Sequence, residues 1–481
     1  MLRQEVYALD GTNKERHPCA VTEQNLAIRR LQPRAGNRHA VFLTHPRETI
    51  NYHYERNPAD PRIAHALTLE VDEFGNVLKS AAVGYGRRQS IRVEDAQGGI
   101  NEIPNPELNK LDLSDRPQQT QPLITYTENN FTKAMDAADD YRTPMPCETR
   151  TYELTGYAPS GGAGRFQSPD FVKPNPKDHN GIKLIHDFDR EIAYEDKPTN
   201  GRQRRLIEQL RTLYRPDDLG AARNDPLALL PFETVEPLAL PGETYKLAFT
   251  PGLLTQVYQR PHDGRPPENL LPDPASVLLA RGAGGQAADR GGYVDLDGDG
   301  HWWIPSGRTF YSPRSDDTAE QELAYARQHF FLPQRYRDPF GQTATMTYDA
   351  HDLLVVETRD PLGNRVTVGE RDRAGNLTAP GNDYRVLQPR QVMDPNRNRT
   401  AVVFDALGMV AGTAVMGKPE ENLGDSLAGF EADLTEAVVL DHLANPLADP
   451  HAVLGKATTR LVYDLFAYRR TRNGLDPLRV W

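Results

Sequence analysis

Aspartates recur at an almost fixed interval in the C-terminal third of this chain. Between about residues 330 and 416 they are 11 or 12 residues apart, except for one longer gap after residue 372. The aspartates are Asp338, Asp349, Asp360, Asp372, Asp394 and Asp405, and glycines follow at Gly341, Gly363, Gly375 and Gly408. Self-similarity at a short fixed period is typical of repeat architectures. This feature restricts the fold more than any other in the sequence.

Each repeat combines a tight turn with a strand. In Asp338-Pro339-Phe340-Gly341, aspartate suits the first position of a type I turn, proline the second and glycine the fourth. About seven residues remain between turns, or roughly 23 Å of extended chain. They have strand composition, as in the alternating segment 343–348. The pattern predicts a mainly β fold of antiparallel strands in which the repeated aspartates and glycines are structural turn formers. An isolated copy surrounds Asp72.

The overall composition excludes several classes of protein. The chain has 481 residues and a formal net charge of −11, so it has no global attraction for nucleic-acid phosphates. It has no run of 18 apolar residues, so no membrane span is expected, and its first residues lack the apolar region of a cleavable secretory signal. Its 39 prolines and 37 glycines suit many strands joined by turns.

The repeat and several other segments together resemble a known family. Tyr348-Asp349 followed by a tight turn is similar to the YD or RHS repeat. Other segments that carry the resemblance are Phe42-Leu43-Thr44-His45-Pro46-Arg47-Glu48-Thr49, Leu69-Glu70-Val71-Asp72-Glu73-Phe74-Gly75-Asn76, Pro146-Cys147-Glu148-Thr149-Arg150 and Trp302-Trp303-Ile304-Pro305. Together they resemble the C-terminal half of the B component of bacterial insecticidal Tc toxins, over essentially the whole chain.

The resemblance implies a non-enzymatic structural role. In that family the B and C components build a hollow β-sheet cocoon that holds an unfolded toxic enzyme until it passes through the A-component channel. The implied partners are therefore the remaining part of the B component, a C component that carries the toxic effector, and the A-component channel. The complex would be assembled in the bacterial cytoplasm and secreted. The family's N-terminal propeller and the C-component cleavage motif are missing, so we expect a fragment or a split gene.

Two other functions compete with the container. YD repeats also occur in adhesion-type proteins, so the alternative is a secreted or surface module that recognises a glycan or a host receptor. A hydrolase would need a catalytic constellation, and the sequence has no Gly-x-Ser-x-Gly and no dinucleotide fingerprint. The repeated aspartates share one turn context, whereas a catalytic pair needs two unlike environments. No catalytic residue and no organic cofactor is therefore expected.

The chain divides into three expected regions. Residues 1–155 are a B-component-type β region, residues 156–330 a loop-rich β region, and residues 331–481 the repeat sheet. Helices are expected near 202–215, where Leu206, Leu210 and Leu213 share one helical face, and near 316–331. In the second helix Ser315 is the expected N-cap, and the apolar face is Ala319, Leu323, Ala326 and Phe330.

One acidic loop has the composition of a calcium site. Asp295, Asp297 and Asp299 alternate with other residues, and glycines follow the second and third aspartates, as in an oxygen-ligated Ca²⁺ loop. The twelfth position, however, is Ser306 rather than a bidentate glutamate, and the flanks look like strands rather than helices. The loop is thus either a cation site or a Gly-Asp hairpin turn. A further Asp476 in Gly-Leu-Asp-Pro is interpreted as a turn.

Overall fold

The computed structural model describes residues 2–94, 99–178, 183–279, 292–421 and 423–472. Asp476 lies outside these residues. The chain forms two compact units: unit 1 contains residues 1–217 and 227–306, and unit 2 contains residues 218–226 and 307–481. Strands dominate both units and helices are few and short, so the prediction of a mainly β fold is confirmed. No described helix is long and apolar enough to cross a membrane.

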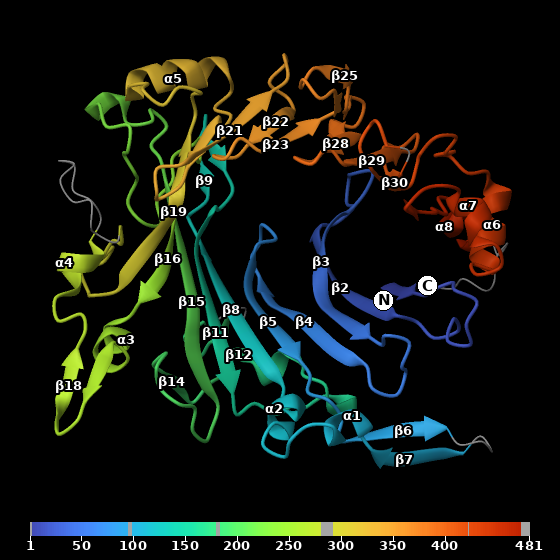
Figure 1. The fold of residues 1–481 in the computed structure, drawn as a ribbon, viewed down its shortest axis with the longest axis horizontal. Helices are drawn as coiled ribbons and strands as arrows, with labels where there is room; N and C mark the ends of the chain where they lie inside the picture. The colour runs from blue at the N-terminus through green and yellow to red at the C-terminus, as the bar shows by residue number, and fades with distance from the viewer. Residues whose placement is uncertain (1, 95–98, 179–182, 280–291, 422, 473–481) are drawn as a thin grey trace. The chain divides into compact units, whose positions relative to one another are not determined.

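Unit 1 is built on a series of antiparallel strands that pair with one another in chain order (Figure 1). They are β1 (Leu2–Val6), β2 (Ala20–Gln32), β3 (Val41–His53), β4 (Arg62–Val71), β5 (Val77–Gly84), β8 (Leu123–Phe131), β11 (Pro146–Thr155), β15 (Gln203–Tyr214) and β16 (Pro241–Phe249). The short strand β14 (Arg190–Ile192) pairs with β15 in parallel. Consecutive pairing is what hairpin connections between antiparallel strands produce.

Smaller elements of unit 1 lie in the connections. The two-stranded ribbons are β6 (Ser90–Glu94) with β7 (Ile100–Pro104), β9 (Met135–Asp136) with β10 (Tyr141–Arg142), β12 (Val172–Pro174) with β13 (Leu184–His186), and β17 (Gln259–His262) with β18 (Arg265–Asn269). The helices are α1 (Pro106–Asn109), α2 (Arg116–Thr120), α3 (Pro251–Gln256) and α4 (Pro274–Leu278), with 3₁₀ turns at Gly162–Gly164 and Ser168–Asp170.

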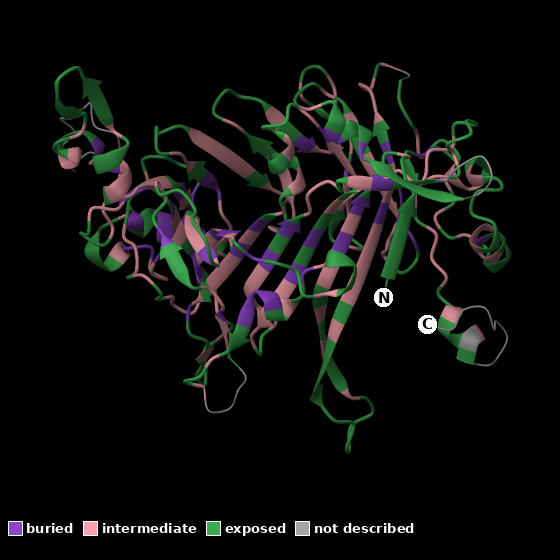
Figure 2. Ribbon diagram, turned by 90° about the horizontal axis from the view of Figure 1, so that it is seen from below, coloured by how far each residue is buried: buried purple, intermediate pink, exposed green. Residues whose placement is uncertain are grey.

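The main core of unit 1 lies on one face of the sheet. Alternate residues of β4, β5, β8 and β11 supply Leu67, Leu69, Ala81, Val83, Ile124, Tyr126, Tyr152 and Leu154, and the segment after β11 covers them with Tyr157, Phe166, Phe171 and Val172. This period of two is the expected pattern for strands with one covered face. Figure 2 shows the resulting bands of buried and exposed residues across neighbouring strands. Each fully buried large side chain contributes about 1.5–3 kcal/mol.

Unit 2 contains the repeats. The strand β19 (Trp302–Phe310) enters it at Gly307 and pairs with β20 (Arg335–Arg337). The following strands pair antiparallel in chain order: β21 (Thr343–Tyr348), β22 (Val355–Arg359), β23 (Arg365–Val368), β28 (Gln391–Met393), β29 (Arg399–Phe404), β30 (Val410–Met416) and β31 (Thr459–Arg460). Two ribbons fill the longer gap in the repeat, β24 (Glu370–Arg371) with β25 (Leu377–Ala379) and β26 (Asn382–Asp383) with β27 (Gln388–Pro389).

The helices of unit 2 lie in connections between paired strands and after the last strand. They are α5 (Ala319–Gln328), α6 (Glu436–Ala444), α7 (Pro450–Leu454) and α8 (Ala467–Arg472), with a 3₁₀ turn at Ala221–Arg223. The helix α5 lies inside the range expected from the sequence, but its N-cap is Thr318 and not Ser315. Thr318 and Gln321 form a capping box, in which each side chain bonds the other residue's backbone N–H. Phe330 does not share the buried face, because the helix ends before it and its side chain is 74% exposed.

The helix predicted near 202–215 is wrong, because these residues form the strand β15. A register shift in the pairing of β11 with β15 places Tyr152 opposite Leu206 and Thr151 opposite Glu208, so that Ile207 is a bulge residue. The bulge reverses the alternation in mid-strand, and leucines at 206, 210 and 213 then mimic a helical spacing. Two paired neighbours, β11 and β16, override the helical propensity of this Arg- and Leu-rich segment.

Candidate functional site: aspartate-clasped turns and the networks around them

The turn at Asp360 shows how one repeat is closed. The Oδ1 atom of Asp360 accepts hydrogen bonds from the backbone N–H groups of Leu362 (2.9 Å) and Asn364 (2.8 Å). The backbone N–H of Asp360 donates to the Asn364 carbonyl, and that of Gly363 donates to the Asp360 carbonyl, both at 3.0 Å. Gly363 has φ of +87°, a conformation that glycine adopts without penalty. We call this arrangement a clasped turn.

The same clasp recurs along the chain. The Oδ1 atoms of Asp72, Asp338, Asp349 and Asp405 also accept from the backbone N–H groups two and four residues on, and Asp372 and Asp394 accept from the N–H four residues on. Gly341, Gly375 and Gly408 have φ between +83° and +90°. Where the glycine is missing, Asp352 and Arg397 take its place with φ of +54° and +69°. All ten turn residues named from the sequence therefore lie in such turns.

An asparagine whose role was not predicted from the sequence completes four of the clasps. The Nδ2 atom of Asn364 donates to Oδ2 of Asp360 at 2.7 Å. Asn76, Asn376 and Asn398 make the same bond to Asp72, Asp372 and Asp394 at 2.9, 3.0 and 3.0 Å. The signal was visible, because asparagine recurs four residues after these aspartates.

In two of these turns the clasp favours the ionised form of the aspartate. The asparagine side-chain hydrogen bond is the largest effect that lowers the pKa of Asp360 and of Asp372 below its ordinary value. In the four clasps that contain an asparagine, backbone and amide donors occupy both carboxylate oxygens. The turn carboxylates thus share one environment, whereas acid–base catalysis uses two carboxylates in unlike environments. In this arrangement the carboxylates close turns through hydrogen bonds.

The acidic loop is organised as a turn in unit 1. Asp295 accepts from the backbone N–H groups of Asp299 (3.2 Å) and Gly300 (3.1 Å). Asp297 forms an ion pair with Arg211 at 2.6 Å. Paired backbone bonds of 2.8 Å join Val294 and Trp303 on either side of the loop, as in a hairpin. In the described part of the chain, no group of three or more His, Cys, Asp or Glu side chains could hold a metal ion.

The ion pair at Asp297 leads to a buried polar network on β11 and β15. Glu148 is buried and accepts from Arg211 (2.9 Å), Gln209 (2.7 Å) and Asn130 (3.0 Å), and it forms an ion pair with Arg150 at 2.8 Å. Burial alone would raise the pKa of Glu148, but the hydrogen bonds from Arg211 and Gln209 outweigh it and the pKa is lowered.

The guanidinium group of Arg211 is also held between two aromatic rings. It lies 4.6 Å from the ring centre of Trp303 and 4.7 Å from that of Phe232. Stacking of a cation on an aromatic face adds to the stability of such a buried pair. Trp303 is 1% exposed and therefore does not present its ring to solvent.

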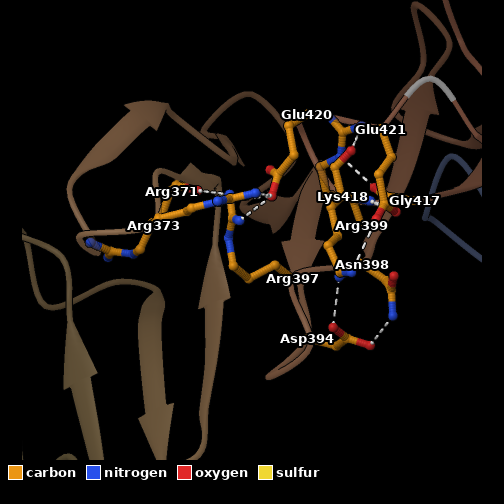
Figure 3. A network of polar contacts seen from close by, with 10 residues as sticks. All are labelled: Arg371, Arg373, Asp394, Arg397, Asn398, Arg399, Gly417, Lys418, Glu420 and Glu421. Atoms are coloured by element: carbon orange, nitrogen blue, oxygen red, sulfur yellow. Dashed lines mark hydrogen bonds and ion pairs between the residues drawn. The ribbon is translucent and has the colours of Figure 1, made fainter.

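A second network joins separate turns in unit 2 (Figure 3). Glu420 Oε1 accepts from Arg397 (2.7 Å) and from Arg373 (3.0 Å), so one carboxylate links the turns at Asp372 and Asp394 to the segment after β30. Arg399 donates to the Gly417 carbonyl at 3.0 Å and pairs with Glu370 at 2.7 Å. These contacts hold the segment that contains β24 and β25, which lies in the longer interval between repeat aspartates, against the main strands.

Comparison with known families gives a match in the N-terminal part of the chain. Residues 1–143 match the family model described as the insecticide toxin TcdB middle/C-terminal region. This part of the chain is thus similar to a B-component region of insecticidal Tc toxins. The matched residues, 1–143, contain the strands from β1 to β10 and the clasped turn at Asp72. Among curated proteins, none matches the chain.

Solved structures with likeness to the chain come from the same kind of toxin. The crystal structure of TcdB2-TccC3 is 24% identical, with a TM-score of 0.43, over 92% of this chain and 18% of that chain. The TcdB2-TccC3-TEV crystal structure is 22% identical, with a TM-score of 0.43, over 100% and 21%. The Photorhabdus luminescens Tc holotoxin pore is 21% identical, with a TM-score of 0.42, over 98% and 20%. The chain spans about one fifth of the length of these chains.

Proposed function

We propose that this chain forms part of the wall of a container that encloses a toxic polypeptide and protects it until delivery. The observation that carries the proposal is the match of residues 1–143 to the TcdB toxin region. In this role the chain performs no chemistry of its own. Its partners would be the rest of the B component and a C component that carries the effector, and through them an A-component channel. The assembled complex would form in the bacterial cytoplasm and be secreted.

The strand order supports a wall. In each unit, consecutive strands pair with one another, so the inner strands use their backbone donors and acceptors on both sides. A sheet of this kind can be widened strand by strand while its backbone stays hydrogen-bonded. Among the described pairings, β1 has β2 as its one neighbour and β31 has β30. Such edges bind further strands readily, as a wall completed by other chains requires.

The tips of the clasped turns also support association with a partner. The residue two positions after the aspartate is apolar and exposed in three repeats: Phe340 is 87% exposed, Leu362 85% and Leu407 68%. Single exposed apolar residues are common on protein surfaces, but a repeated position supplies the same contact at each turn. In the proposed wall, these tips would be covered by neighbouring subunits or by the enclosed chain.

Co-expression tests the proposal. The full chain is produced with the remaining B component and with a C component that carries its effector, and the complex is imaged by electron microscopy and treated with protease. We expect a closed particle that contains this chain and an effector that resists digestion. A complex without this chain, or an effector that is digested at the same rate with and without it, contradicts the proposal.

A matched pair of variants sharpens the test. Replacing Phe340 and Leu362 by serine removes two exposed tips and leaves the hydrogen bonds of the clasps in place. We expect reduced yield of the closed particle with an unchanged melting temperature of the isolated chain. Leu113→Ser, at a residue that is 78% exposed and outside the repeats, is the control. Equal yields for both variants argue against a contact role for the tips.

A further inference from the structure

Three turns of unit 2 surround a cavity of about 250 Å³. Its lining comes from residues 363–367 on β23 and the turn before it, from residues 371–375 in the turn between β24 and β25, and from residues 393–397 at the turn after β28. A water molecule occupies about 30 Å³ in the liquid, so the cavity has room for a small anion with part of its hydration shell.

The cavity is lined by four arginines, Arg365, Arg371, Arg373 and Arg397. The two lining aspartates, Asp372 and Asp394, already accept the hydrogen bonds of their clasps. Three of the four arginines pair with carboxylates outside the cavity: Arg365 with Glu357, and both Arg373 and Arg397 with Glu420. Arg371 differs from them. In the part of the chain that the structure describes, it forms no ion pair, and the bond that its guanidinium makes goes to the Gly375 carbonyl at 3.1 Å.

Thr367, which also lines the cavity, carries a buried hydroxyl group. Thr367 is 3% exposed, and its Oγ1 atom has no hydrogen-bond partner. Thr367 and Arg365 are two residues apart on β23 and so share one face of the strand, and Met393, the register partner of Thr367, also lines the cavity. Val366 points to the other face, where it lines a separate cavity.

Three of the lining arginines, Arg365, Arg371 and Arg397, have a buried Nε atom for which the described part of the chain supplies no acceptor. A buried polar atom that lacks a hydrogen bond destabilises the folded chain, and four such donors at one cavity indicate an acceptor that the protein chain itself does not supply. Guanidinium groups match the geometry of oxyanions with parallel hydrogen bonds.

We propose that this cavity binds a tetrahedral oxyanion of the phosphate class, held by Arg371 with the Nε donors of Arg365 and Arg397 and the hydroxyl of Thr367. The anion would join the turns at Asp360, Asp372 and Asp394 into one unit. Binding of this kind stabilises the folded chain in proportion to the logarithm of anion concentration. The inference concerns unit 2 alone and does not depend on what the wall encloses.

The test uses the full chain and inorganic phosphate as the probe. Isothermal titration calorimetry and thermal melting are carried out in chloride, acetate and phosphate buffers of equal ionic strength. We expect phosphate to raise the melting temperature above that in chloride or acetate. The affinity for phosphate should fall at least tenfold in Arg371→Gln and in Thr367→Val. Arg390→Gln, at an arginine that bonds the Pro380 carbonyl outside the cavity, should bind as the parent does.

Thr367→Val separates anion binding from a purely structural role. Valine has nearly the shape of threonine and carries no unpartnered hydroxyl, so this variant should melt at the parent's temperature or above in chloride and lose the gain in phosphate. Three outcomes overturn the proposal: no stabilisation by phosphate beyond that of chloride, equal stabilisation by acetate, or an unchanged phosphate response in both cavity variants.

Discussion

Unit 1 and the repeat strands of unit 2 hold their sheets together by different means. In unit 1, twelve buried side chains from β4, β5, β8, β11 and the segment after β11 form one apolar cluster. In the strands from β20 to β23 no apolar side chain is buried. A clasp closes each of the turns that connect these strands. The apolar cluster of the first sheet joins residues far apart in sequence, whereas each clasp of the second joins residues within five positions of one another.

This difference has a physical consequence for how each sheet can grow. A core of packed side chains fixes the number of strands, because every member must find its partners. A clasped turn specifies only its own hairpin, so the repeat can be lengthened by one hairpin without redesign of the others. The second arrangement suits a wall, but it contributes less stability per residue. The predictions that follow measure that contrast.

The largest contrast is expected from one substitution made in both units. Phe171→Ala in unit 1 removes a side chain that is fully buried in the apolar cluster, whereas Phe340→Ala in unit 2 removes one that is 87% exposed. We expect the first to destabilise the fold by about 3–5 kcal/mol and the second by less than about 0.5 kcal/mol. Urea denaturation followed by tryptophan fluorescence measures both. Similar losses for the two variants would show that the tip of the repeat is also a core position.

The polar networks should differ in the same direction. Arg211→Leu leaves the buried carboxylate of Glu148 with fewer donors, at a cost of about 1–3 kcal/mol. Arg373→Leu breaks the ion pair with Glu420, in which the arginine side chain is 80% exposed, and exposed pairs contribute about 0–1 kcal/mol. The two denaturation midpoints, measured in one buffer, give the comparison. A larger loss from Arg373 than from Arg211 would reverse our ranking of the networks.

The two regions also differ in how far the sequence foretells them. The turns of unit 2 were predictable, since Asp360 and Gly363 act within their own hairpin and need no distant partner. The strand β15 was not, because the bulge at Ile207 and the pairing with β11 hide its alternation. The network of Glu148, Arg211 and Asp297 joins residues far apart in sequence, and no local pattern announces it.

A smaller effect is expected from opening one clasp. Asp360→Ala removes the acceptor for the N–H groups of Leu362 and Asn364 and should lower the stability of unit 2. Asp316→Ala is the matched control, because Asp316 is also in unit 2 and pairs with exposed Arg314; its loss should be smaller. The midpoint of urea denaturation measures both. Equal losses would mean that the clasp is no stronger than a surface ion pair.

Acid should weaken the clasps gradually. The pKa of Asp360 and of Asp372 in the folded chain lies below the ordinary value of 3.8, because the asparagine four residues on donates to each carboxylate. The unfolded chain therefore binds more protons, so this stability is fully present above the unfolded pKa and is lost as the pH falls through the folded pKa. The double variant D360N/D372N should show a flatter dependence of melting temperature on pH between about pH 5 and pH 2. An unchanged slope would contradict the assigned pKa direction.

The smallest effect is expected at the acidic loop, where the two interpretations of the sequence differ most. If Asp295, Asp297 and Asp299 held a cation, Ca²⁺ would raise the melting temperature with the logarithm of its concentration. In unit 1, however, Asp295 already accepts two backbone N–H groups and Asp297 pairs with Arg211. We therefore expect the same melting temperature in millimolar Ca²⁺ and in chelator. A rise that Asp295→Asn abolishes would restore the calcium site, because that substitution keeps a side-chain acceptor for the turn but removes the charge.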